Sequence, residues 1–205
     1  MPNNDTKTIF DGMVKSFTDI LNLLTAAGNA FRDDGHPDFS VDILHRQFEL
    51  SIQCALLAVS LADGKISKAE IAAIASLGVH ADLMEMLSDE ETEFKWDELP
   101  AQSPYIISKF QLNIERNLEK LLDDFCLFLV LYKETRPEDE VDPFMTSFLT
   151  DCRELAQGLA EIDGNRDENE QYVLEDKIKS YYLEGMLRVL EKISADDDGN
   201  RRPQA

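Results

Sequence analysis

The sequence predicts an all-α fold: a single helical domain of about seven to nine helices, built from two pseudo-symmetric halves. Apolar residues recur at helical spacing almost throughout, and the period-2 alternation of strands is absent. The two halves also match when the sequence is shifted by 100 residues without a gap. We expect the domain to span 1–195, with halves at about 5–92 and 103–193, a connector at 90–103 and a disordered acidic tail at 196–205.

Helix breakers divide the first half into its elements. The first apolar stripe, from Ile9 to Leu24, ends before the Asp33-Asp34-Gly35-His36-Pro37 breaker, and the second helix is stopped by Asp63-Gly64. Four helices are expected here, from about Ile9 to Arg32, Ser40 to Ala62, Ser67 to Leu77 and Ala81 to Leu87.

The second half repeats this order after the connector. Ser103 is suited to the N-cap and Pro104 to the first position of a long helix that lasts to about Glu134. Its Asp123-Asp124 pair is expected at an exposed helix edge. The acidic stretch EDEVD (138–142) is interpreted as a solvated loop, with Asp142-Pro143 starting the next helix. Two more segments are expected to be helical, from about Pro143 to Ile162 and from Asp167 to Ile193.

The internal repeat is carried by breakers and apolar positions in a single frame. A shift of 100 residues aligns the Asp63-Gly64 pair with Asp163-Gly164. The same shift matches, with their counterparts, Phe10, Leu21, Pro37, Val41, Asp42, Phe48, Glu70, Leu83, Met86, Leu87 and Glu91. Each half is therefore expected to be a helix, helix, Asp-Gly turn, helix unit.

The charge balance is strongly acidic. The chain has 20 Lys and Arg against 41 Asp and Glu, a formal net charge of −21. Such a surface repels phosphate backbones, so we expect no direct binding of nucleic acid. It favours cations, a basic protein partner, or no role beyond solubility. The sequence does not predict an oligomeric state.

A cytoplasmic location without membrane insertion is expected. The longest apolar run, Phe125 to Tyr132, is too short to span a bilayer, and the N-terminal residues lack the pattern of a signal peptide. Cys54, Cys126 and Cys152 lie at unrelated spacings within apolar stretches, which is typical of reduced core thiols.

No enzyme motif is present in the sequence. His36, His45 and His80 do not form a zinc-binding pattern, and there is no Gly-rich phosphate loop or nucleophile elbow. We therefore expect a protein that is not an enzyme.

The two Asp-Gly turns are the candidate functional feature. Asp63, Gly64 and Glu70 fall at positions 5, 6 and 12 of an EF-hand loop, and Asp163, Gly164 and Glu170 do the same. Positions 1 and 3 of the first copy would be Val59 and Leu61, which cannot be ligands, so a true EF-hand is rejected. What stays open is a partial site for a hard cation, Ca²⁺, Mg²⁺ or Mn²⁺, completed by other groups.

A purely structural interpretation competes with the cation site. The glycines suit helix C-termini, Ser67-x-x-Glu70 is a capping box, and Asp167-x-x-Glu170 offers an equivalent N-cap and N3 pair. Capping explains both glutamates without a metal. It leaves Asp63 and Asp163 without a clear local role, and the alternative for these two is that they are turn residues.

The stretch ALLAVSLADGKISKAEIAAI (55–74) resembles the signature of TerB-like tellurite-resistance domains, and GLAEIDGNRDENEQYVL (158–174) resembles the matching motif in their second half. The resemblance covers about residues 40–190. It implies an internally duplicated helical fold, a role in bacterial stress or phage defence, and divalent cation binding by acidic residues. The implied metal ligands are Asp63, Glu70, Asp163 and Glu170.

Two functional hypotheses follow. The first is a non-enzymatic TerB-like adaptor or sensor in bacterial stress response or defence, which binds a protein partner and a divalent cation. The alternative is an acidic inhibitory protein, an immunity protein or nucleic-acid mimic, whose charge itself occupies a basic partner.

Overall fold

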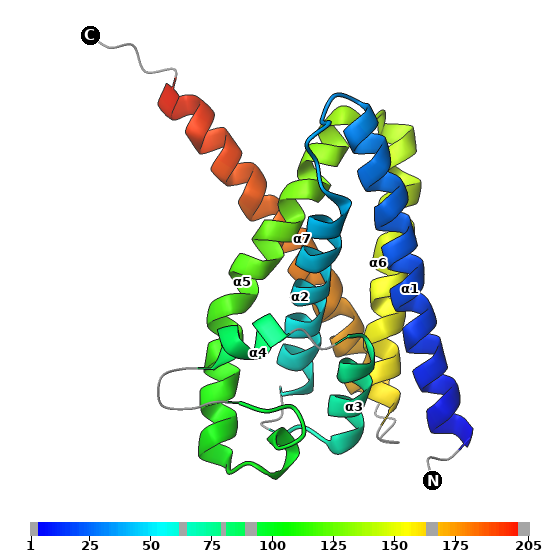
Figure 1. Cartoon of the computed structure of the whole chain (residues 1–205), viewed down its shortest axis with the longest axis vertical. Coiled ribbons are helices and arrows are strands. Elements are labelled where there is room, and N and C mark those ends of the chain that lie inside the picture. Colours follow the sequence, from blue (N-terminus) through cyan, green and yellow to red (C-terminus); the bar gives the residue numbers. More distant parts are fainter. Residues whose placement is uncertain (1–3, 62–64, 79–80, 89–93, 163–167, 201–205) are drawn as a thin grey trace.

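The computed structural model describes residues 4–61, 65–78, 81–88, 94–162 and 168–200. It confirms the predicted all-α class (Figure 1). The described residues form seven α-helices and one short 3₁₀ helix, with no strand among them. The helices are α1 (Asn4–Asp33), α2 (Val41–Ser60), α3 (Lys68–Ser76), α4 (Ala81–Leu87), η1 (Leu99–Ala101), α5 (Pro104–Thr135), α6 (Glu138–Glu161) and α7 (Glu168–Asn200).

Serine caps begin α2, α3 and α5. The Ser40 hydroxyl accepts the N–H of Ile43 at 3.3 Å and starts α2. The Ser103 hydroxyl accepts the N–H of Ile106, and Pro104 occupies the first turn of α5, as predicted. A cap satisfies N–H groups that have no partner within the helix.

The start of α6 corrects the sequence prediction. The EDEVD stretch is not a loop: α6 begins at Glu138 and contains Pro143, so Asp142 is not its N-cap. Pro143 lacks the N–H that would bond to the carbonyl four residues earlier, which normally disfavours a helix interior. The extra turn is held because Val141 is buried and because Arg136 pairs with Glu140 at 3.5 Å.

The last segment is a single helix where the first half has two. Gly78 has a φ of +95° and lies in the break between α3 and α4. Its repeat counterpart is Ile178, which is fully buried within the continuous α7. This helix runs through Asn200, beyond the expected start of the tail at 196, and residues 201–205 lie outside the described residues.

Each of the two main helix pairs contains one helix from each half of the chain. α1 packs along α6, and α2 packs along α5. Exchanging α1 with α5 and α2 with α6 converts one pair into the other, which is the relation that a pseudo-two-fold axis produces. α7 crosses behind this bundle and contacts α5, α6 and α2 (Figure 1).

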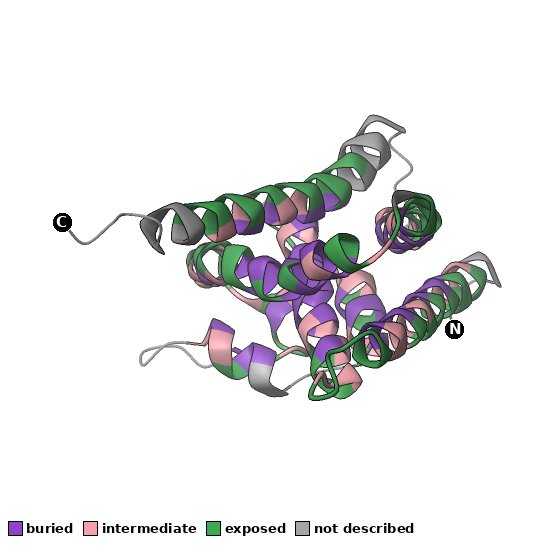
Figure 2. Ribbon diagram, turned by 90° about the horizontal axis from the view of Figure 1, so that it is seen from above, coloured by how far each residue is buried: buried purple, intermediate pink, exposed green. Residues whose placement is uncertain are grey.

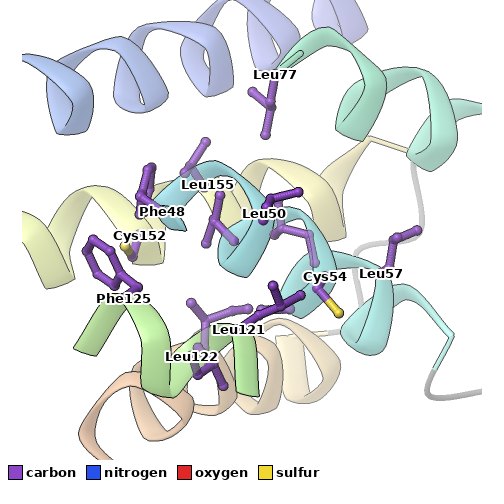
Figure 3. Close-up of a cluster of buried hydrophobic side chains, with 14 of the residues drawn as sticks. Phe48, Leu50, Cys54, Leu57, Leu77, Leu121, Leu122, Phe125, Cys152 and Leu155 are labelled. Carbon is purple, nitrogen blue, oxygen red and sulfur yellow. The ribbon is translucent and has the colours of Figure 1, made fainter. Parts of the chain in front are cut away.

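One aromatic residue from each of α2, α5, α6 and α7 meets at the centre of the core. Phe48 and its repeat counterpart Phe148 have ring centroids 5.9 Å apart, and Phe125 and Tyr182 close the cluster at 5.2 to 5.7 Å from them or from each other. The buried Tyr182 hydroxyl lies 3.2 Å from the Ser51 hydroxyl, which satisfies its polar end. Figure 3 shows Phe48 and Phe125 beside Cys152 and Leu155 in this region.

Buried residues face the middle of the bundle and exposed residues line its outside (Figure 2). In the part of the chain that the structure describes, no helix has both the length and the apolar character needed to cross a membrane.

Candidate functional site

The helices that flank the two Asp-Gly motifs come together at one end of the bundle. α2 ends at Ser60 and α6 at Glu161, while α3 begins at Lys68 and α7 at Glu168, all toward the lower end of Figure 1. α6 also contacts both α2 and α3. Asp63 and Asp163 themselves lie outside the described residues, so their predicted role as ligands stays a prediction.

Glu70 is part of a complete capping box. Its carboxylate Oε2 accepts the N–H of Ser67 at 2.7 Å, and the Ser67 hydroxyl accepts the N–H of Glu70 at 3.1 Å. The capping role predicted from the sequence is therefore confirmed for this residue. At least one oxygen of the Glu70 carboxylate is committed to the start of α3.

The remaining predicted ligand is placed only in part. Glu170 lies in the first turn of α7, and its side chain is outside the described residues. Among the side chains that are described, no group of three or more His, Cys, Asp or Glu residues is arranged to hold a metal ion. Only Glu70 of the four predicted ligands enters that search.

An acidic seam between α1 and α6 was not predicted from the sequence. The Ser16 hydroxyl donates to Glu154 Oε2 at 2.7 Å across the two helices. Partial burial, and then the charges of Glu154 and Asp19, raise the pKa of Asp151, while Lys15 lowers it. The sequence carries no local signal for this seam, because it forms only when the two halves pack.

Asp123 corrects another prediction. It is only 9% exposed and does not lie at an open helix edge, whereas Asp124 does. Arg188 Nε donates to Asp123 Oδ1 at 2.9 Å, and the Arg188 Nη2 atom forms an ion pair with the same oxygen at 2.8 Å. Lys192 donates to Asp123 Oδ2 at 2.6 Å. These contacts fasten α7 to α5. Charge-assisted pairs of this kind are stronger than neutral hydrogen bonds.

The three cysteines are free and buried, as predicted. Burial raises the pKa of Cys54 to about 12. Burial first, and then the charge of Asp123, raise that of Cys126 to about 12 against the opposing effect of Arg188. Burial also raises the pKa of Cys152 well above its usual value. Because the thiolate is the reactive form, these thiols are poor nucleophiles and poor metal ligands at neutral pH.

No known protein family, curated protein or solved structure matches this chain. The resemblance to TerB-like domains therefore rests on the two motifs at 55–74 and 158–174 and on the duplicated helical order.

Proposed function

We propose that this chain is a non-enzymatic, TerB-like adaptor or sensor of bacterial stress response or defence, acting in the cytoplasm. It binds a protein partner, and a divalent cation bound by acidic residues at the two Asp-Gly turns strengthens that binding. The observation that carries the proposal is the duplicated arrangement of α2 and α3 and of α6 and α7, whose ends flank both motifs at one end of the bundle (Figure 1).

The chemistry of the motifs supports a hard cation. Carboxylate oxygens suit Ca²⁺, Mg²⁺ or Mn²⁺ better than zinc. The Glu70 carboxylate already serves a cap, so few protein ligands are available at the first turn. Low affinity follows, and a carboxylate from the partner would complete the coordination.

Cation titration tests the proposal directly. Amide NMR shifts of the wild type and of Asp63→Asn/Asp163→Asn are followed while Ca²⁺, Mg²⁺ or Mn²⁺ is raised to millimolar concentration. Site-specific shifts in the wild type that disappear in the double variant support the proposal. No site-specific response of the wild type would eliminate the cation site.

Glu70 offers a sharper comparison, because its cap and its charge can be separated. Gln retains the oxygen that accepts the Ser67 N–H, whereas Ala removes the capping interaction altogether. If Glu70 ligates the cation, both Glu70→Gln and Glu70→Ala weaken the cation response. If it only caps α3, Glu70→Gln leaves both the response and the thermal stability nearly unchanged.

The net charge of −21 favours the second candidate function, an acidic inhibitory protein that occupies a basic partner. Binding by such a protein would be unaffected by a chelator and would weaken steeply with salt. Partner capture that is lost with a chelator, and lost in Asp63→Asn/Asp163→Asn, would favour the adaptor instead.

A further inference from the structure

An exposed apolar stripe runs along the outside of α7. Leu183, Leu187 and Leu190 follow one another at i, i+4 and i+7, and their side chains are 40%, 60% and 39% exposed. This spacing places them on a single face of the helix. That face lies beside the core-facing side of α7, which carries the buried Tyr182 and Val189. We name these three leucines the α7 leucine face.

The internal repeat shows that such leucines can form a packing surface. Leu83 and Leu87, the counterparts of Leu183 and Leu187, are fully buried. They are buried because the break at Gly78 lets α4 lie against α5, where Asn113 Nδ2 donates to the Leu87 carbonyl at 2.9 Å. α7 has no such break, so the same pair of leucines is carried out to the surface.

The charge around the α7 leucine face selects the partner. Glu184 and Glu191 are exposed and lie three residues before and four residues after Leu187, so they form an acidic border along the stripe. Arg188 and Lys192 are engaged by Asp123 on the side facing α5. The exposed Lys179 lies one turn before Leu183, so the acidic border flanks the Leu187 end of the stripe. A second copy of a chain with a net charge of −21 would bring like charge to this border.

We propose that the α7 leucine face docks a basic amphipathic helix of the partner protein. Apolar side chains of that helix cover the three leucines, and its Lys or Arg residues pair with Glu184 and Glu191. This rests on the proposed function in that a protein partner exists, and it adds the surface used and the chemistry that the surface recognises.

A designed peptide tests the docking surface. The probe is a synthetic amphipathic helix with leucines at i, i+4 and i+7 and lysines beside them, and the control peptide has the same composition in scrambled order. Wild-type protein is expected to bind the amphipathic peptide more tightly than the scrambled one. Equal binding of both peptides would show attraction by charge alone and overturn the proposal.

Variants locate the binding on α7. Leu187→Asp is expected to lower affinity for the amphipathic peptide at least roughly tenfold, because burial of a large apolar side chain is lost. The matched control is Leu112→Asp, a change at a leucine on α5 that is 45% exposed, which should leave affinity unchanged. Leu183→Gln is a milder second variant, and circular dichroism shows whether each variant is folded. A folded Leu187→Asp or Leu183→Gln protein with wild-type affinity would refute the proposal.

The acidic border is tested separately. Glu184→Gln/Glu191→Gln should weaken binding several-fold at low salt and reduce its salt dependence, whereas Asp124→Asn/Glu134→Gln, which removes two exposed charges on α5, should have a smaller effect. If both double variants weaken peptide binding equally, Glu184 and Glu191 do not contribute specifically to docking.

Further measurements separate the other outcomes. Sedimentation showing a wild-type dimer that Leu187→Asp dissolves would make a second copy the occupant and overturn the proposal. Failure of peptide binding with cation-dependent capture of a partner retained would refute this surface alone. Peptide binding without any cation response would refute the cation part of the proposed function alone.

Discussion

The substitution Gly158→Ala, which adds one methyl group, tests how closely α1 packs on α6. A Cβ atom at Gly158 would overlap Met13 Cγ and would lie 3.0 Å from the Met13 Sδ. Met13 is only 1% exposed, so its side chain has no open space into which to move. Gly158→Ala therefore forces either the Met13 side chain or the two helix backbones to shift.

The magnitude follows from two opposing effects. Replacing Gly by Ala inside a helix stabilises it by about 0.5–1 kcal/mol. Overpacking a filled core destabilises by about 1–3 kcal/mol. Gly12 is the matched control, because it lies within α1, is exposed and has nothing within 4 Å of an added Cβ. Gly12→Ala should show only the stabilisation, so the two variants should differ in unfolding free energy by about the whole overpacking cost.

Urea unfolding followed by circular dichroism measures this difference, with the m-value checked for constancy. Adding Met13→Ala vacates the space that the new methyl group needs, so Gly158→Ala in that background should no longer destabilise. Equal stabilisation by Gly158→Ala and Gly12→Ala would refute the reasoning, and would mean that α1 and α6 lie farther apart than the close approach at Met13 requires.

Two further predictions concern buried and partly buried charge. The raised pKa of Asp151 means that its ionised form opposes folding. The contribution of Asp151 to stability is therefore fully present at pH values below the ordinary 3.8 and is lost as pH rises through the folded-state pKa. Asp151→Asn should therefore raise the unfolding free energy at neutral pH, and this gain should vanish in acid urea titrations; a gain that is independent of pH would contradict the assignment. Arg188→Leu should destabilise by about 1–3 kcal/mol, because the buried Asp123 keeps only its Lys192 partner. Asp123→Leu/Arg188→Leu should recover much of that loss, and a double variant as unstable as the sum of the two single ones would show that the pair does not act together.

Local signals in the sequence were sufficient where a few neighbouring residues determine the structure. Ser103-Pro104 begins α5, and Ser67 with Glu70 begins α3, because a cap is satisfied within one turn. Phe48 and Phe148, which the predicted repeat places at equivalent positions, meet in the core.

Prediction from the sequence was wrong where a distant contact overrides the local signal. Pro143 indicated a helix start, but burial of Val141 holds the turn before it. Asp123 resembled a surface residue because its partners, Arg188 and Lys192, come from another helix, 65 and 69 residues later in the chain. Such pairings have no signature in the residues around either partner.

The sequence predicts which residues belong to the candidate site, but not how their side chains are arranged in space. The sequence places Asp63 and Asp163 in equivalent turns, and the structure adds that the flanking helices end together and that Glu70 caps α3. Ligation depends on how carboxylate oxygens from separate turns converge, which a one-dimensional spacing does not specify.

The two halves of the chain differ in where their last leucines lie. In the first half, Gly78 breaks the last segment and lets α4 bury Leu83 and Leu87, which completes the core. In the second half, Ile178 continues the helix, so the α7 leucine face is presented outward. α7 begins beside the second Asp-Gly motif, and Leu187 lies 19 residues after Glu168, or about 28 Å along the helix. At that distance the proposed cation and the proposed docked helix would share no contact. Cation binding at the turns and peptide binding at the α7 leucine face should therefore each be lost separately by substitution, even where one partner protein uses both.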